Sequence, residues 1–284
     1  MRDLLRMLLV AAAVLLLGAV AWRLIFGADD LAPLTVERVD GDVVLIGTSG
    51  VQPATPGMVL ERSERITTEA GGRAVLGIGE ETRLVLHAAS TLRVLGQDEE
   101  GVRVELEGGR VQATVRPGSG AVGVLTDGRE VRATDASFSV GLTEEGTTIV
   151  EDNVGEIELR GFGELTSLNP GQRVIAMPDA APQLDIVPDS LLLQVEWPEQ
   201  VKTRASTVTI RGRTDPGARV RVRGGEGEVT ALADPDGGFE LQIALAEGVN
   251  DLDLAAVDAL GQEQQVSWTI TRDSTAPPAT FEIP

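Results

Sequence analysis

The residues of this chain best suited to chemistry are carboxylates, and the most ordered group of them lies in Asp234-Pro-Asp-Gly-Gly-Phe-Glu240. Oxygen ligands at alternating positions ahead of a glycine turn are typical of the start of a calcium-binding loop. The complete pattern of such a loop is absent, and the internal proline and phenylalanine favour a hairpin turn that leads into a strand. We therefore expect Asp234, Asp236 and Glu240 to shape a turn, with calcium binding as the alternative.

A serine or cysteine nucleophile needs a neighbouring base, which is most often histidine. The chain has no cysteine and a single histidine, His87, at the end of the strand-like run Leu84–His87. Tetrahedral zinc sites need several histidine or cysteine ligands, so the same composition excludes zinc. We expect His87 to be structural or on the surface, and we predict no catalytic residue and no cofactor.

Paired carboxylates can perform acid-base chemistry, as in glycoside hydrolysis. The candidate pairs stand beside glycines in turn-like contexts, which predicts solvated loops; they are Glu80-Glu81, Asp98-Glu99-Glu100 and Glu144-Glu145. The pairs Gly108-Gly109 and Gly224-Gly225 are also predicted turns, because neither opens a helix that could hold a phosphate. The inventory of side chains therefore argues against an enzyme.

The elements that carry these residues follow a long apolar run at residues 7–26. Twenty residues at about 1.5 Å each reach roughly 30 Å, the thickness of the hydrocarbon core of a bilayer. Arg2 and Arg6 precede the run while Asp29 and Asp30 follow it. The positive-inside rule then predicts a single-pass anchor that exports everything after it.

On this interpretation residues 1–6 form a cytoplasmic stub. A cleaved secretory signal is the alternative, because Ala19-Val-Ala21 fits the small-x-small pattern of a cleavage site. Leu24–Phe26 prolong the apolar run past that site and favour the uncleaved anchor. Both interpretations place the rest of the chain outside the cytoplasm.

Composition limits the partners of the exported part. The formal net charge of the chain is -20, which repels nucleic acid and anionic surfaces, so we predict no nucleic-acid partner. Without cysteine no disulfide can form in an oxidising compartment, and each domain must be stabilised by its own hydrophobic core.

Short apolar-polar alternations separated by turn residues divide the rest of the chain and predict an all-β protein. A typical example is Val102–Glu107, which is followed by two glycines. We predict a first β domain over residues 34–176, a proline-rich linker at 177–189, a second β domain at 190–273 and a tail at 274–284.

Several ordered motifs of the first block resemble the FecR-type periplasmic domain. The early ones are Val36–Val43, Pro56–Leu60, Ile66–Thr68, Ala74–Leu76 and Thr82–Leu84, and the later ones are Val131–Val140, Thr148–Ile157 and Leu168–Gln172. The resemblance implies a FecR-like β-sandwich or β-roll in the bacterial periplasm, behind an inner-membrane anchor. FecR-type proteins also regulate a sigma factor through a cytoplasmic region, and Met1–Arg6 do not resemble that region.

The second block resembles a bacterial immunoglobulin-like domain. Its hairpin signature spans Ser206–Val222, and Ala233–Leu241, Leu245–Asn250 and Ala256–Gly261 follow in the expected order. The resemblance implies an immunoglobulin-like β-sandwich that presents a surface or acts as a spacer. Trp197 and Trp268 flank this block, and we expect them to pack at a sheet edge or a domain junction, with carbohydrate stacking as the alternative.

Two classes of function remain open. The leading hypothesis is a non-enzymatic, membrane-anchored envelope protein whose domains bind or scaffold an unknown envelope protein or cell-wall partner. The alternative is the periplasmic sensing component of a transmembrane signalling system that lacks its own sigma-regulating domain. The predicted location is the bacterial inner membrane, through residues 7–26, with the β domains in the periplasm; cleavage of the signal would make the protein secreted or periplasmic.

Overall fold

The computed structural model describes residues 32–275, apart from 49, 99 and 199. All regular elements of this part of the chain are strands, β1 to β24, and no helix able to cross a membrane occurs in it. The all-β prediction is therefore confirmed for the described residues. The predicted stub, the predicted membrane segment 7–26 and most of the predicted tail lie outside them.

The first domain is built from two sheets that share one strand. Sheet 1 runs in the order β1 (Leu34–Asp40), β5 (Arg73–Ile78), β6 (Thr82–Leu86), β8 (Gly101–Val115), β11 (Ala136–Leu142), β12 (Thr148–Gly155), β15 (Gln172–Ala176) and β16 (Gln183–Ile186). Sheet 2 runs in the order β3 (Gly50–Pro53), β2 (Val43–Gly47), β4 (Arg65–Thr68), β7 (Ser90–Asp98), β8, β9 (Ala121–Thr126), β10 (Arg129–Ala133), β13 (Ile157–Phe162) and β14 (Leu165–Leu168).

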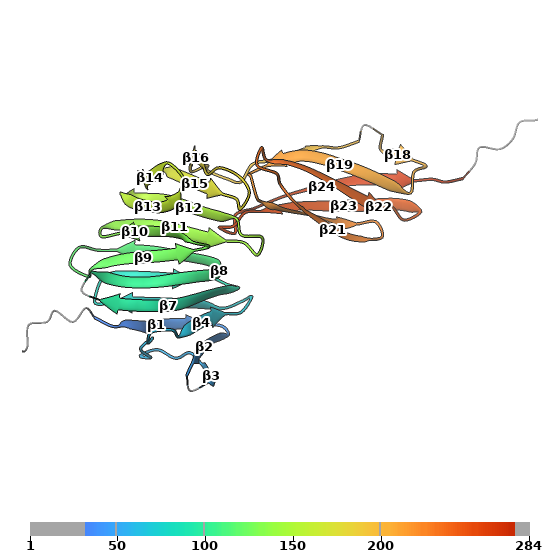
Figure 1. Ribbon diagram of the computed structural model, residues 1–284. Coiled ribbons are helices and arrows are strands. Elements are labelled where there is room, and N and C mark those ends of the chain that lie inside the picture. The colour runs from blue at the N-terminus through green and yellow to red at the C-terminus, as the bar shows by residue number, and fades with distance from the viewer. Residues whose placement is uncertain (1–31, 49, 99, 199, 276–284) are drawn as a thin grey trace, which may run out of the picture.

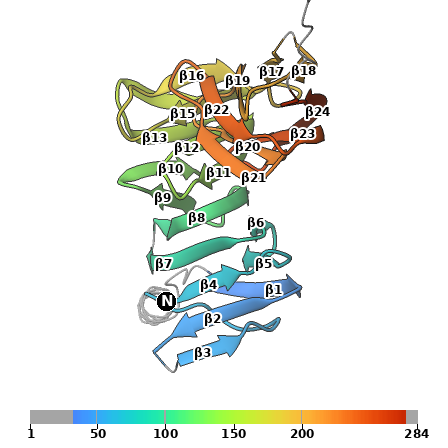
Figure 2. The same cartoon turned by 90° about the vertical axis from the view of Figure 1, so that its right-hand side faces the viewer.

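The long strand β8 connects the two sheets by bending at Gly108-Gly109. Its first half pairs with β7 and β9, and its second half pairs with β6 and β11. Gly109 has a φ of 85°, and a Cβ there would lie 2.6 Å from the carbonyl oxygen of Ala89, so only glycine fits the bend. The strands stack roughly in chain order from β1–β3 at one end to β16 at the other (Figures 1 and 2).

The core of the first domain lies between these sheets. Ala136, Phe138 and Val140 are 4%, 0% and 0% exposed, so these three alternate residues of β11 face inward together. The alternation of buried residues in β8 shifts from even positions such as Val104 to odd positions such as Val111, as expected where one strand moves from one sheet to the other. The first domain thus consists of two sheets that enclose one core and are joined through β8.

The second domain is a smaller sandwich with its own core. One sheet holds β17 (Leu193–Glu196), β19 (Thr207–Thr214) and β22 (Gly238–Ala244); the other holds β18 (Lys202–Thr203), β24 (Glu263–Arg272), β23 (Gly248–Val257), β20 (Arg219–Gly224) and β21 (Gly227–Leu232). Trp197 and Trp268 stack on each other with ring centroids 5.2 Å apart, and both pack against this core. These tryptophans therefore close the side of the sandwich.

The segment predicted as a linker contains a strand. Residues 183–186 form β16, which pairs with β15 at the end of sheet 1. The proline content of 177–189 concealed it, because the strand is short and lies between Pro182 and Pro188 at a sheet edge, where proline is tolerated.

We predict that Phe138→Ala lowers the free energy of unfolding of the first domain by about 3 to 5 kcal/mol, because it leaves a cavity in a fully buried position. Denaturant unfolding followed by circular dichroism measures the change. Val154→Ala is the control, since Val154 lies on the neighbouring β12 and is 57% exposed. A loss below about 1 kcal/mol for Phe138→Ala would contradict its place in the core.

Candidate functional site

The second domain docks one of its ends onto the outer face of sheet 1, and Arg173 of β15 lies at the centre of this contact. Its guanidinium donates to Asp215 of the β19–β20 loop at 2.7 Å and to Asp185 of β16 at 3.0 Å. The side chains of Arg173 and Asp215 are only 3% and 6% exposed. We call this contact between the two domains the junction.

Further polar contacts surround Arg173. Arg110 of β8 donates to the carbonyl oxygen of Leu260, 2.5 Å away, in the β23–β24 loop. From the second domain, Gln262 donates to Glu151 of β12 at 3.4 Å. Gln183 of β16 donates to the carbonyl oxygen of Pro235 at 2.7 Å. Together with the Arg173–Asp215 pair, these contacts hold two loops and one hairpin turn of the second domain on four strands of sheet 1, β8, β12, β15 and β16.

Apolar packing and the glycine at position 141 bring the domains into close contact. Leu260 packs with Ile149 and Ile175 in a small buried cluster that is separate from both domain cores. A Cβ on Gly141 would lie 2.3 Å from the carbonyl oxygen of Ala259, so β11 can meet the second domain only with glycine there. The buried, close contact makes the junction an interface rather than a flexible tether.

The junction is rich in buried carboxylates. Burial raises the pKa of Glu151, and the nearby charge of Asp258 raises it further. Burial also raises the pKa of Asp258, although its carboxylate accepts backbone N–H groups of Gln262 and Leu260. Arg173 and Arg110 offset part of this charge, which explains why two arginines face the same interface.

Glu144 and Glu145 also take part, whereas the sequence predicted only a solvated loop for them. Both form ion pairs with Arg219 of β20, at 3.1 and 2.5 Å. The pair therefore connects the β11–β12 loop to the second domain at the rim of the junction. A sequence pattern gives no hint of this contact, because Arg219 lies in a different domain.

The other predicted site residues do not converge. Asp234 accepts the backbone N–H groups of Asp236 and Gly238 at 2.9 and 2.8 Å, which is the geometry of a turn. Glu240 pairs with Arg211 at 2.8 Å. Over residues 32–275, with the gaps given above, no three His, Asp or Glu side chains are arranged to hold a metal ion.

His87 and the remaining acidic pairs also lack a catalytic arrangement. The buried Nε2 of His87 has no hydrogen-bond partner, and burial lowers the pKa of this imidazole. Glu80 and Glu81 are exposed in the β5–β6 turn, and Glu100 pairs with Arg132 at 3.4 Å. No described hydroxyl group is thus hydrogen-bonded to the imidazole nitrogen that would have to activate it.

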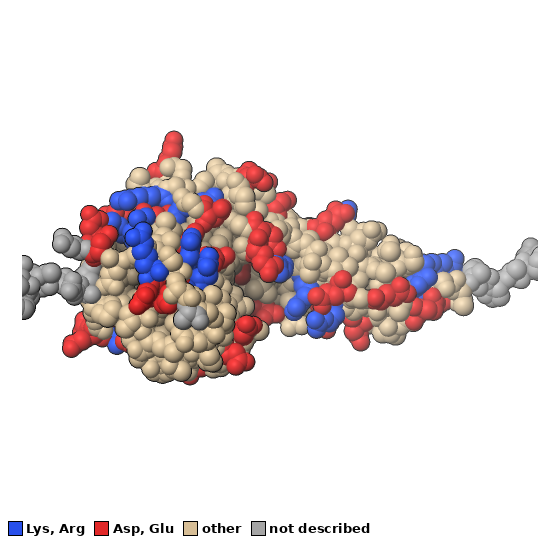
Figure 3. Space-filling model, turned by 60° about the horizontal axis from the view of Figure 1, so that its bottom comes forward, with Lys and Arg blue, Asp and Glu red and all other residues tan. Residues whose placement is uncertain are grey.

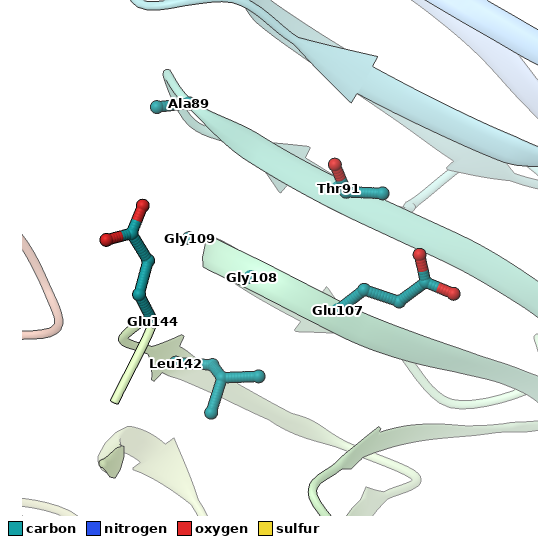
Figure 4. A pocket seen from close by; sticks show the side chains of 7 residues that line it. All are labelled: Ala89, Thr91, Glu107, Gly108, Gly109, Leu142 and Glu144. Carbon is teal, nitrogen blue, oxygen red and sulfur yellow. The ribbon is translucent and has the colours of Figure 1, made fainter. Parts of the chain in front are cut away.

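A hollow of about 340 Å³ lies beside the bend of β8, and its lining includes Glu107 of β8 and Glu144 of the β11–β12 loop (Figure 4). Both carboxylates already have partners, since Glu107 pairs with Arg65 and Arg93 and Glu144 pairs with Arg219. Both acidic side chains that line the hollow are therefore held in ion pairs, so neither is placed as an unpaired general acid or base.

Sheet 2 carries a ladder of opposite charges on its outer face, which the sequence analysis missed. Its members are Arg65, Arg93, Arg103, Arg160, Glu105, Glu107 and Glu130, paired across β4, β7, β8, β10 and β13. Figure 3 shows basic and acidic side chains gathered in adjacent rows on the first domain. The polar positions of the alternating strands, such as Arg103, Glu105 and Glu107, are the signal that could have revealed it.

The described part of the chain is thus an all-β protein of two docked domains. Residues 64–158 match the family described as FecR protein, and residues 196–273 match the family described as bacterial Ig domain. The chain accordingly contains a FecR-type segment, which covers the middle of the first domain, and a bacterial immunoglobulin-like domain. These two matches confirm both resemblances. No curated protein sequence matches the chain.

Among solved structures, the chain is similar to a proposed anti-sigma factor from Parabacteroides distasonis, with 21% identity and a TM-score of 0.39. The match covers 43% of this chain and 59% of the anti-sigma factor structure, so this chain spans less than two thirds of the length of that protein. A tetra-tandem repeat from the extending region of a large adhesion protein is 15% identical, with a TM-score of 0.28, over 86% of this chain and 68% of that one. Similarities this weak transfer no function.

We predict that Arg173→Ala destabilises the docked protein by about 3 to 5 kcal/mol, because it leaves Asp215 buried without its partner. Calorimetry of the full chain should show the unfolding of the two domains separating into two transitions. Arg211→Ala, which removes an ion pair that is about 60% exposed on both sides, should leave the melt almost unchanged. If Arg173→Ala and Arg211→Ala changed the melt equally, the junction would not couple the unfolding of the two domains.

Asp152 generates a pH-dependent prediction. This residue of β12 is 0% exposed, and burial raises its pKa to about 6 although a backbone hydrogen bond from Val154 opposes the shift. Because the folded state favours the neutral acid, this group destabilises the fold increasingly as the pH rises from the unfolded-state pKa of 3.8 to about 6, and the cost is fully present above pH 6. Asp152→Asn should therefore raise the melting temperature at pH 7.5, and its advantage should shrink by pH 4.5. A constant difference across that range would show that Asp152 is not the titrating group.

Proposed function

We propose that this chain is the non-enzymatic, extracytoplasmic sensing component of a transmembrane signalling system. The FecR-type segment at residues 64–158 supports this class, because FecR-type domains serve in envelope signalling. In this proposal residues 7–26 anchor the chain in the bacterial inner membrane, and the two β domains lie in the periplasm. A second membrane protein receives the signal.

The observation that carries the proposal is the buried junction at Arg173. A sensor must transmit a change from the domain that meets a ligand to the domain next to the membrane. A flexible linker would absorb such a change, whereas Arg173 and the close approach at Gly141 connect the two sandwiches mechanically. Binding at the second domain can thus alter the position or the stability of the first.

A scaffold in the cell envelope is the second candidate. The exposed side chains of Leu184 and Ile186 on the edge strand β16, 49% and 72% exposed, favour it. Such an edge can pair with a strand of an envelope protein or lie against the cell wall. Scaffolding needs no coupling between the two domains, and this difference separates the candidates.

The test is a Gly141→Val variant of the full chain, expressed from its own locus in the source bacterium. Valine would clash with the Ala259 carbonyl group and open the junction while sparing both cores. For a sensor we expect a confined set of transcripts to change in the same direction as in the deletion strain, with a normal protein level on immunoblots. Gly227→Val is the control, because a Cβ at Gly227 meets open space. Envelope defects in the deletion strain alone, with Gly141→Val behaving as wild type, would favour the scaffold.

A further inference from the structure

One end of the first domain differs in chemistry from the rest of the chain. No charged residue occurs between Val43 and Leu60, although 24% of the whole chain is charged and its net charge is -20. This segment comprises β2, β3 and the loop that follows β3. In Figure 3, which brings that end forward, a broad area without charged side chains adjoins the charged rows. We call this surface the uncharged end.

The uncharged end is firmly built. The backbone N–H of Val36 donates to the carbonyl oxygen of Met58, and the N–H of Leu60 donates to the carbonyl oxygen of Leu34, both at 2.8 Å. These bonds hold the loop against β1 and close the edge of sheet 1. The side chain of Leu60 is buried below, whereas Val51 and Val59 are 68% and 47% exposed. Apolar side chains are thus fixed on the outside by an ordered backbone.

The chain enters the fold at this same end. β1 begins at Leu34, directly beside Leu60. Only residues 27–33 separate β1 from the apolar run 7–26. Fully extended, such a spacer reaches at most about 25 Å. An anchor at 7–26 therefore holds the uncharged end closer to the bilayer than the second domain, which lies beside the strands at the other end of the stack (Figures 1 and 2).

We infer that the uncharged end rests on the lipid interface of the membrane that holds residues 7–26. The inference rests on the membrane anchor in the proposed function. Anionic headgroups repel the acidic remainder of the chain, so the uncharged end is the surface that can approach them. Val51 and Val59 contribute apolar contact, and the short tether keeps their local concentration at the membrane high. This contact orients the molecule and directs the second domain away from the bilayer.

The absence of cysteine allows a clean test with single-cysteine variants of the full chain. Val51→Cys and Val59→Cys each carry an environment-sensitive fluorophore, and the protein is reconstituted in phosphatidylcholine vesicles that contain brominated lipid. Val249→Cys in the second domain is the matched control, since Val249 is 68% exposed like Val51. We expect a blue shift and quenching by brominated lipid at positions 51 and 59, and neither effect at 249.

A third variant tests whether the apolar side chains cause the contact. With the fluorophore at position 59, Val51→Asp should reduce quenching by brominated lipid, whereas Val249→Asp should leave it unchanged. Full access of iodide to the probe at 51, equal to that at 249, overturns the inference. A probe at 51 that is shielded from iodide but not quenched by brominated lipid also overturns it, since protein, such as a second copy of the chain, then covers the surface.

Vesicle flotation separates failure of this inference from failure of the anchor. A chain that floats with the vesicles but shows no lipid quenching keeps its anchor and loses the lipid contact. A chain that does not float has no anchor, and the lipid contact is overturned together with that part of the proposed function.

Discussion

The arrangement of the two domains depends on the burial of one guanidinium group. Arg173 cannot lose its hydration without acceptors, because an unpaired buried charge costs several kcal/mol. Its acceptors come from two places: Asp185 lies on β16, and Asp215 lies in the second domain. Satisfying this one charge therefore orders the segment between the domains and fixes the second domain on sheet 1. A buried ion pair gives little net stability compared with apolar packing, but it selects one geometry, which is what a rigid connection requires.

Close approach of backbone atoms explains the glycines at the contact surfaces. Gly109 permits β8 to leave one sheet and enter the other, and Gly141 permits β11 to touch the second domain. In both places a side chain would occupy the position of a backbone oxygen. The first glycine makes the sandwich possible, and the second makes the junction close enough to exclude water from Arg173. The close approach that these glycines allow and the ion pair of Arg173 with Asp215 therefore both depend on the strands of sheet 1.

Much of the fold could be predicted from the sequence, because its information is local. Apolar-polar alternation and turn residues predict the all-β fold, and the core positions such as Phe138 follow the same alternation. The junction could not be predicted in this way. Arg173, Glu144 and Arg219 are ordinary polar residues of exposed strand positions or loops until a second domain covers them. At Asp234 the local sequence does predict the local geometry, since Oδ1 of this residue accepts backbone N–H groups of its own turn, as expected.

The division of charge over the molecule follows from these constraints. Sheet 2 is covered with paired charges that satisfy one another across strands, and sheet 1 uses Arg110, Glu151 and Arg173 to hold the second domain. The uncharged end differs from both sheets, because its segment between Val43 and Leu60 contains no charged side chain that would need an ion-pair partner. A protein with a net charge of -20 can approach an anionic membrane only with such a surface. The rigid junction then transfers this orientation to the second domain, because a loosely tethered domain would keep no fixed direction relative to the bilayer.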